Sequence, residues 1–298
     1  MEKKKRVIFL ICIFFLALIL RIFFISTLDN TIDVWGDWWD ELGWKLATGQ
    51  GYWVNNPYFP DGPVYYSWRA PMFPLFLAAV YKLFGHSFLA AKVCLAIISS
   101  ITAVLLFFIS KCFMSERNSV IVALLYAVYP AAIFWTGYLA PVSLEIFFAV
   151  LMVYVCLMAV KKGTFFLFFV AGFILGFGVL TRSVFFIFLP VIFIWLLIIQ
   201  NIKFAFKSTV YVFLSCVVTI SPWVLRNYHI HKTFLLTSTE GGIVCYIANN
   251  EKSLFQASGY WDPTGQYNEP VIKKIKGLSE IETDRYFYRA AFEFIKTH

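Results

Sequence analysis

Three acidic residues lie close together in the segment Asp33–Tyr52, DVWGDWWDELGWKLATGQGY. At about 100° per residue, Asp37, Asp40 and Glu41 fall on one face of a predicted helix that ends at Gly49. Neighbouring carboxylates raise the pKa of one of them or share a cation. A carboxylate with a raised pKa is a good general base, which takes the proton of an acceptor hydroxyl as that hydroxyl attacks. The segment therefore predicts either a catalytic acidic cluster or a solvated acidic face, and it permits a divalent cation without requiring one.

The other face of this helix is apolar and carries Trp35, Trp38, Trp39, Leu42 and Leu46. An indole ring suits the headgroup level of a bilayer, where the ring is buried while its N–H stays hydrated. We therefore predict that the helix lies flat on a membrane, with its carboxylates facing water or a cavity above the lipid. The alternative is an amphipathic anchor that has no catalytic role.

Four arginines lie beside or inside apolar segments. Arg182 separates two hydrophobic runs, Arg226 follows the last run, and Arg69 stands in the motif SWRAP. Arg21 lies inside the first run, where a charge costs a few kcal/mol unless it reaches the interface or meets an anion. Because the forked donors of guanidinium groups fit a phosphodiester, the set predicts a lipid-phosphate site at the outer leaflet. For each arginine taken alone, the sequence favours anchoring at the headgroups.

Further polar residues accompany this set. Glu145 lies near the start of an apolar run, about one turn after Pro141, and is predicted to pair with an arginine or to face a water-filled cavity. The loop from residue 240 to 267 carries amides, including Asn250, and rings of the kind that contact sugars. His229 and His231 form an HxH pattern with no further ligands nearby, so we interpret them as surface histidines and assign no metal site.

The composition is that of a membrane protein. Of the 298 residues, 60% are hydrophobic, 20% are aromatic and only 14% are charged, which is far from the composition of soluble domains. The net charge of +8 comes mostly from basic residues in short gaps between apolar runs, so we attribute it to membrane topology and not to nucleic-acid binding.

The six cysteines suggest no disulfide framework. The N-terminal MEKKKR with its apolar run is predicted to be a retained signal anchor.

Seven apolar runs are long enough, or nearly so, to cross a bilayer of roughly 30 Å: residues 7–27, 88–110, 120–135, 142–160, 165–180, 184–199 and 209–225. Residues 71–85 are shorter and are predicted to be a re-entrant or juxtamembrane helix. With the N-terminus in the cytoplasm, every inner loop is then basic, as the positive-inside rule requires. The first external loop (28–70) and everything after residue 225 lie outside the cell in this topology.

We therefore predict an all-α polytopic protein with a transmembrane domain at 1–225 and an extracytoplasmic segment at 226–298. In the latter, a helix over Glu280–Lys296 is predicted from a capping box formed by Ser279 and Glu282. This helix carries an apolar stripe made of Ile281, Tyr288, Phe292 and Ile295.

At these residues the chain resembles the polytopic GT-C glycosyltransferases, the superfamily of the protein O-mannosyltransferases and the bacterial aminoarabinose and lipopolysaccharide-core sugar transferases. The matching pieces, in order, are GDWWDELGWKLATGQGYW, SWRAPMFPLFLAAVYKLFG, the Leu144–Glu145 pair, LTRS, SPWVLRNY and STEGGIVCYIANN. The chain ends where members usually continue with further membrane helices, so we expect it to be truncated relative to them.

The resemblance implies a polyprenyl-phosphate sugar donor and inverting transfer on the outer face of the membrane. It implies that Asp37, with Asp40 and Glu41 as rivals, is the base or a substrate ligand. Binding of the lipid phosphate and the sugar is assigned to Arg69, Glu145, Arg182, Arg226, Asn227 and Asn250.

The sequence thus predicts a glycosyltransferase of the bacterial plasma membrane that acts on a lipid, glycan or protein acceptor. Two alternatives stay open. A transporter or flippase of lipid-linked sugars would use the same arginines without a base, and a truncated subunit would assemble with a relative without catalysing transfer.

Overall fold

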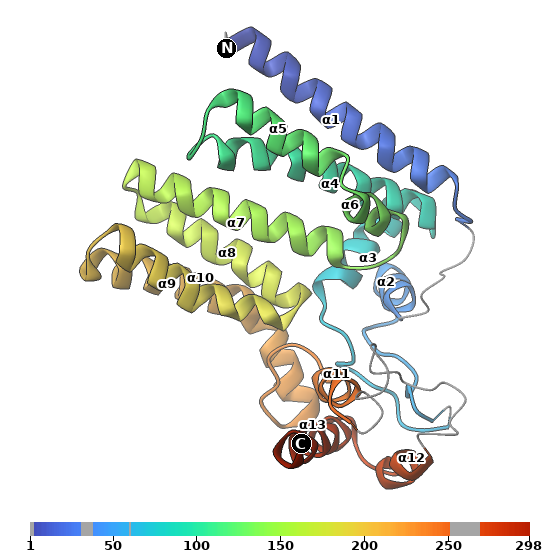
Figure 1. Cartoon of the computed structure of the whole chain (residues 1–298). Helices are drawn as coiled ribbons and strands as arrows, with labels where there is room; N and C mark the ends of the chain where they lie inside the picture. The colour runs from blue at the N-terminus through green and yellow to red at the C-terminus, as the bar shows by residue number, and fades with distance from the viewer. Residues whose placement is uncertain (1–2, 31–37, 60, 251–268) are drawn as a thin grey trace. The chain divides into compact units, whose positions relative to one another are not determined.

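The computed structural model describes residues 3–30, 38–59, 61–250 and 269–298. Its contacts divide the chain into two compact units, each drawn in Figure 1. The membrane unit consists of Met1–Gln50 and Pro71–Trp223, and the C-terminal unit of Gly51–Ala70 and Val224–His298. The predicted domain boundary at residue 225 is close to the second division. Gly51–Ala70, which the sequence analysis assigned to the first external loop, is grouped here with the end of the chain.

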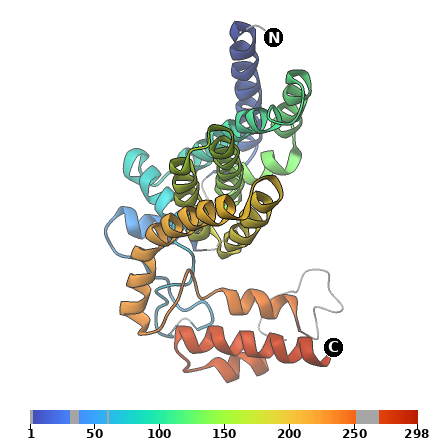
Figure 2. The same ribbon diagram turned by 90° about the vertical axis from the view of Figure 1, so that its left-hand side faces the viewer.

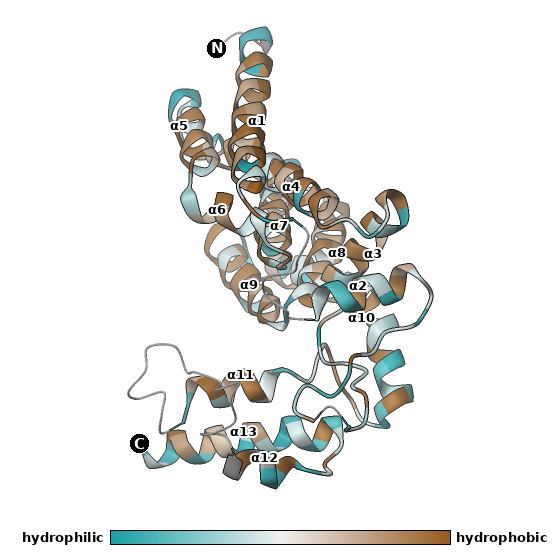
Figure 3. Ribbon diagram, turned by 90° about the vertical axis from the view of Figure 1, so that its right-hand side faces the viewer, coloured by the Kyte–Doolittle hydropathy of each residue, from teal (hydrophilic) through white to brown (hydrophobic). Residues whose placement is uncertain are grey.

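The membrane unit is built from helices that are apolar over most of their length (Figure 3). Their bounds are α1 Lys3–Ser26, α2 Trp39–Ala47, α3 Met72–Phe84, α4 Phe88–Ser110, α5 Glu116–Ala127, α6 Pro130–Phe134, α7 Val142–Lys162, α8 Phe165–Thr181, α9 Phe188–Ile199 and α10 Ile202–His231, with 3₁₀ turns η1 Trp135–Gly137 and η2 Ser183–Ile187. The described residues contain no named strand. The prediction of an all-α polytopic membrane protein is confirmed.

Each of the seven predicted runs is helical, but the helices differ in length. Four of those in the described part, namely α1, α4, α7 and α10, are long and apolar enough to cross a membrane. A fifth span results if α5 and the segment Pro130–Gly137, which meet at a bend of 51°, are one broken span. The runs at 165–180 and 184–199 form the shorter apolar helices α8 and η2–α9. Helix α3 is also short, as predicted for residues 71–85.

Arg21 has a structural role inside the membrane unit. Its side chain is fully buried and donates hydrogen bonds to Ser99 Oγ (2.9 Å), to the carbonyl of Ala17 (2.9 Å) and to that of Ala127 (3.0 Å). Ala127 is the last residue of α5, where helical carbonyls lose their intrahelical partners. Arg21 supplies the missing donor at the bend after α5, so it does not belong to a lipid-phosphate site.

Two glycines allow α8 to approach α10 closely. Gly172 and Gly176 have the small-xxx-small spacing of helix contacts in membranes. A Cβ atom on Gly172 would lie 1.9 Å from Ser215 Oγ and 2.2 Å from the carbonyl oxygen of Val212, and one on Gly176 would lie 2.4 Å from Thr219 Cβ. The sequence analysis did not single out this motif, although its spacing was visible in GFILG.

We predict that Gly172→Ala destabilises the protein by about 1–3 kcal/mol, the usual cost of adding volume to a packed interface. The new methyl group would meet backbone of α10, which cannot move aside as a side-chain tip can. Thermal unfolding in lipid nanodiscs measures the effect. Phe166→Leu, at a position on the same helix that is 67% exposed, is the control and should leave the melting temperature unchanged. Equal melting temperatures for Gly172→Ala and the wild type would contradict the close contact.

The C-terminal unit contains the end of α10 together with α11 Gly241–Ala248, α12 Glu269–Ile275 and α13 Glu280–Thr297. Figure 2 shows α11 and α13 side by side. The predicted capping box at Ser279 and Glu282 is present, so the predicted start of α13 is confirmed. The buried stripe of α13 is not the predicted apolar one, because it consists of Glu280, Thr283, Phe287 and Ala291.

Candidate functional site

Helix α2, which carries the acidic residues, packs on α3. Trp39 is 5% exposed and its ring meets that of Phe73 edge-to-face at a centroid distance of 5.5 Å, while Leu42 is 1% exposed. A Cβ atom on Gly43 would lie 2.6 Å from Leu77 Cβ, so the glycine permits the close approach. The prediction that this stripe faces lipid is wrong for Trp39 and Leu42, because α3 supplies an apolar partner within the protein.

Asp40 joins α2 to the far end of α3. Its Oδ1 accepts a hydrogen bond from the hydroxyl of Tyr81 (2.6 Å) and lies 2.8 Å from Nε2 of His86. The imidazole of His86 stacks on Trp44 with a centroid distance of 4.4 Å. Neither Tyr81 nor His86 was singled out from the sequence, because their role depends on how α2 folds back on α3.

Glu41 has a different partner. Its carboxylate pairs with Nζ of Lys45 at 2.5 Å, one turn along α2. Asp37 lies outside the described residues, as do Asp33 and Trp35. Where α2 is described, its two acids therefore interact with separate groups of the protein. In that part of the chain, no group of three His, Cys, Asp or Glu side chains is arranged to hold a metal ion.

Glu145 and Arg182 form an ion pair within the membrane unit. Nε of Arg182 lies 3.1 Å from Oε1 of Glu145, whose side chain is only 14% exposed. The prediction that Glu145 pairs with an arginine is confirmed. Arg182 follows the last residue of α8 in extended conformation, and its side chain is 55% exposed. The described residues give its two terminal nitrogens no partner, so that end of the guanidinium group is open to an anion.

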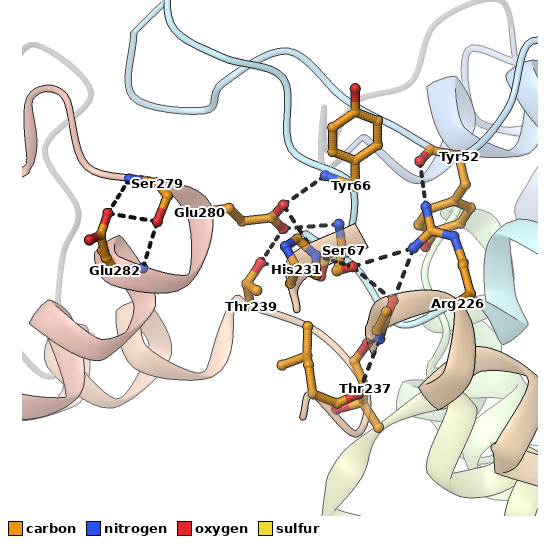
Figure 4. Close-up of polar contacts among 12 residues, drawn as sticks. Tyr52, Tyr66, Ser67, Arg226, His231, Thr237, Thr239, Ser279, Glu280 and Glu282 are labelled. Carbon is orange, nitrogen blue, oxygen red and sulfur yellow. Dashed lines mark hydrogen bonds and ion pairs between the residues drawn. The ribbon is translucent and has the colours of Figure 1, made fainter. Parts of the chain in front are cut away.

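Arg226 contributes to a polar network in the C-terminal unit (Figure 4). Its terminal nitrogens donate to the carbonyl of Tyr52 (2.9 Å), to Oδ1 of Asn227 (3.0 Å) and to Oγ of Ser67 (3.4 Å). Asn227 is fully buried, and its Nδ2 donates to the carbonyl of Leu235 at 3.3 Å. Both residues thus hold the 51–70 segment and the chain after α10 together.

Glu280 lies at the centre of the same network. Its carboxylate accepts hydrogen bonds from the backbone N–H groups of Tyr66 (2.7 Å) and Ser67 (2.9 Å) and from the hydroxyl of Thr239 (2.6 Å). Burial raises the pKa of the Glu280 carboxyl above its ordinary value, and these hydrogen bonds oppose the rise. In the sequence, Glu280 was notable only as the first residue of a predicted helix, and a helix start does not indicate whether a side chain is buried.

The two histidines of NYHIH differ in environment. His229 is exposed, as predicted. The side chain of His231 is only 8% exposed, and its Nε2 lies 2.9 Å from Ser67 Oγ and 3.8 Å from Glu280. The interpretation of His231 as a surface histidine is wrong, because the 51–70 segment covers it.

The remaining predicted ligands also lie in the C-terminal unit. Arg69 forms an ion pair with Glu240, and its guanidinium carbon lies 5.7 Å from the ring centroid of Trp68. The Nδ2 of Asn250 donates to the carbonyls of Tyr246 (2.8 Å) and Ile247 (3.1 Å) just after α11. Tyr260 and Trp261 fall outside the described residues. The assignment of these side chains to sugar and phosphate binding stays a prediction.

Asp284 of α13 supports a prediction about pH. Burial raises the pKa of its carboxyl to about 6, opposed by a hydrogen bond from the N–H of Gly242 (2.6 Å). The folded state therefore binds the proton more tightly than the unfolded state, so stability falls as the pH rises from about 4 to about 6.

We expect Asp284→Asn to reduce the fall in stability between pH 5 and 7.5, leaving the part that Glu280 contributes, and to stabilise the C-terminal unit at pH 7.5 by roughly 1 kcal/mol, allowing for the partial exposure of the group. Hydrogen exchange of α13 amides at pH 5 and 7.5 measures the difference. Glu293→Gln, at an exposed position of the same helix, should leave the dependence in place. If the pH dependence of Asp284→Asn equals that of the wild type, Asp284 does not contribute to it.

Comparison with known proteins gives one family. The family model described as dolichyl-phosphate-mannose-protein mannosyltransferase matches residues 68–225 of the chain, which is more than half of its 298 residues. The match covers Arg69 and the Glu145–Arg182 pair and ends directly before Arg226. No curated protein matches the chain.

Proposed function

Because the chain belongs to the dolichyl-phosphate-mannose-protein mannosyltransferase family, and is thus a membrane glycosyltransferase, we propose that its donor is a polyprenyl-phosphate sugar. The acceptor is a hydroxyl of a lipid, glycan or protein on the extracytoplasmic face. The observation that carries this proposal is the half-exposed guanidinium of Arg182, oriented by Glu145. A positive group fixed beside apolar helices suits a lipid whose phosphate stays at the membrane surface.

Arg182 binds the phosphate of the donor in this proposal. The ion pair with Glu145 uses Nε, which leaves the terminal nitrogens to form a fork around two phosphate oxygens. Arg69 and Arg226 rank second for this role, since Arg69 pairs with Glu240 and Arg226 donates to protein acceptors. Asn227 and Asn250 rank with them, because both amides donate to backbone carbonyls.

We assign the base to the acids of the first external loop, with Asp37 first. The carboxylate of Asp40 is engaged by Tyr81 and His86, and that of Glu41 pairs with Lys45, so both already have partners within the protein. Transfer is a single displacement with inversion. The acceptor oxygen attacks the anomeric carbon as its proton passes to the base, and the bond from that carbon to the phosphate oxygen breaks. Arg182 stabilises the negative charge that develops on the departing polyprenyl phosphate.

The test uses the full chain in proteoliposomes with a polyprenyl-phosphate sugar that is radiolabelled in both the sugar and the lipid. The proposal predicts release of free polyprenyl phosphate and transfer of the sugar label to an acceptor. A transporter would move the intact donor across the bilayer without cleaving it. A non-catalytic subunit would show neither and would co-purify with a longer relative. Either of the last two results would overturn the proposal.

A further inference from the structure

Helix α13 exposes apolar side chains that its own unit does not cover. Tyr288, Phe292 and Ile295 are 37%, 53% and 48% exposed. They follow one another at helical spacing, and the rings of Tyr288 and Phe292 stack at a centroid distance of 6.3 Å. The face that α13 buries is a different one, centred on Phe287 and Ala291. Figure 3 shows the resulting alternation of hydrophobic and hydrophilic residues along α13.

Helix α11 extends this apolar face. A Cβ atom on Gly241 would lie 2.2 Å from the hydroxyl of Tyr288, so the Gly241 side of α11 adjoins the Tyr288 side of α13. Val244 lies one turn further along the same side of α11 and is 58% exposed. Val244 therefore adds an exposed apolar side chain on the side of α11 that adjoins Tyr288.

Basic side chains border this face on one side. Arg289 and Lys296 lie three and four residues from Phe292 and are its neighbours on the helix surface, while Arg285 lies two turns before Phe292 on the same side and also donates to Thr233 Oγ1 (3.3 Å). All three are exposed. An apolar stripe with a cationic border is the pattern of helices that lie in the interface of a bilayer with anionic lipids. A partner protein with an apolar face would not require the basic border.

The chain connectivity limits how far α11 can lie from the end of a helix that is able to span a membrane. Helix α10 is long and apolar enough to cross a bilayer, and its last residues, Val224–His231, belong to the C-terminal unit. Only residues 232–240 separate the end of α10 from α11. At about 3.3 Å per residue, nine residues reach no further than roughly 30 Å.

We propose that the α11–α13 face, formed by Val244, Tyr288, Phe292 and Ile295 with its basic border, binds the surface of a bilayer containing anionic lipids. The apolar side chains enter the headgroup layer, and Arg285, Arg289 and Lys296 contact lipid phosphates. The contact does not depend on the proposed sugar transfer, because none of these residues is assigned to the donor or the acceptor.

The test measures depth in the membrane at two adjacent positions. A nitroxide label is placed on Phe292→Cys or Glu293→Cys in the full chain with its native cysteines replaced, in nanodiscs of phosphatidylcholine and phosphatidylglycerol. Glu293 is exposed and lies about 100° away around the helix. We expect oxygen to reach label 292. A water-soluble nickel chelate should reach label 293 freely and label 292 about threefold less than label 293. Nanodiscs of phosphatidylcholine alone should raise chelate access at 292.

Equal chelate access at both labels would overturn the proposal. Exclusion of both oxygen and the chelate at label 292 would overturn it too, because it would show that protein covers the face. If the cysteine-free background does not fold, a photoreactive phenylalanine is placed instead at position 292 or at position 293 of the chain with its native cysteines. The probe should crosslink to lipid from position 292 and not from position 293. Crosslinking to a second protein chain would contradict the inference.

Discussion

Replacing Asp37 with asparagine is expected to lower the rate of sugar transfer by about 10²–10⁴-fold, the range that a positioned general base contributes. Asparagine has nearly the same size but cannot take the proton of the acceptor hydroxyl. The variant should bind the donor as tightly as the wild type, because the phosphate is assigned to Arg182. Single-turnover release of polyprenyl phosphate measures the first effect, and binding of labelled donor measures the second.

The neighbouring acids supply matched controls. Glu41→Gln should change transfer only a few-fold, because its carboxylate serves a pair with Lys45 that is partly exposed. Asp40→Asn should act mainly on stability, by about 1 kcal/mol, through weaker hydrogen bonds from Tyr81 and His86. Retained transfer by Asp37→Asn at normal expression would remove Asp37 from the role. A larger loss in Asp40→Asn without unfolding would transfer the role to Asp40.

The helices were predictable from local patterns. The apolar run at 88–110 coincides with α4, because the prediction needs only apolar side chains over a sufficient length. The start of α13 was predictable because a capping box consists of two residues three positions apart. Both features are set within one segment, and tertiary contacts did not alter them.

Packing partners were not predictable in the same way. The stripe with Trp39 and Leu42 was correctly identified as apolar, but the sequence does not show that α3 covers it. For the same reason, the sequence left open whether Arg21 reaches the interface or meets an anion, whereas its hydrogen bonds go to groups on three helices of the protein. The buried Glu280 was missed because its three donors come from residues more than 40 positions away.

Within the candidate site, the pairing of Glu145 was predictable because a carboxylate in an apolar helix requires a partner. The choice among the arginines required the structure. Arg226 and Arg182 look equivalent in sequence, since each lies at the end of an apolar run. Arg226 donates to three acceptors within its own unit, whereas Arg182 is half-exposed and makes its one described ion pair through Nε.

Arg182→Ala is expected to reduce transfer by about 10²–10³-fold, the usual cost of losing one group that stabilises developing charge. Arg182→Lys should recover part of this loss, because an ammonium group keeps the charge but not the fork. Glu145→Gln separates positioning from charge. It keeps a hydrogen-bond acceptor for Nε but removes the ion pair, so it should lower kcat less than Arg182→Ala does.

Expression and melting temperature must be measured alongside, since truncating Arg182 removes an ion pair from a carboxylate that is largely buried. The double variant Arg182→Ala with Glu145→Gln removes both charges of the pair. If Arg182 acts on the phosphate, the double variant regains stability but not transfer. If the pair is only structural, transfer returns together with stability, and the donor phosphate must then be bound by another arginine, with Arg69 the first to test.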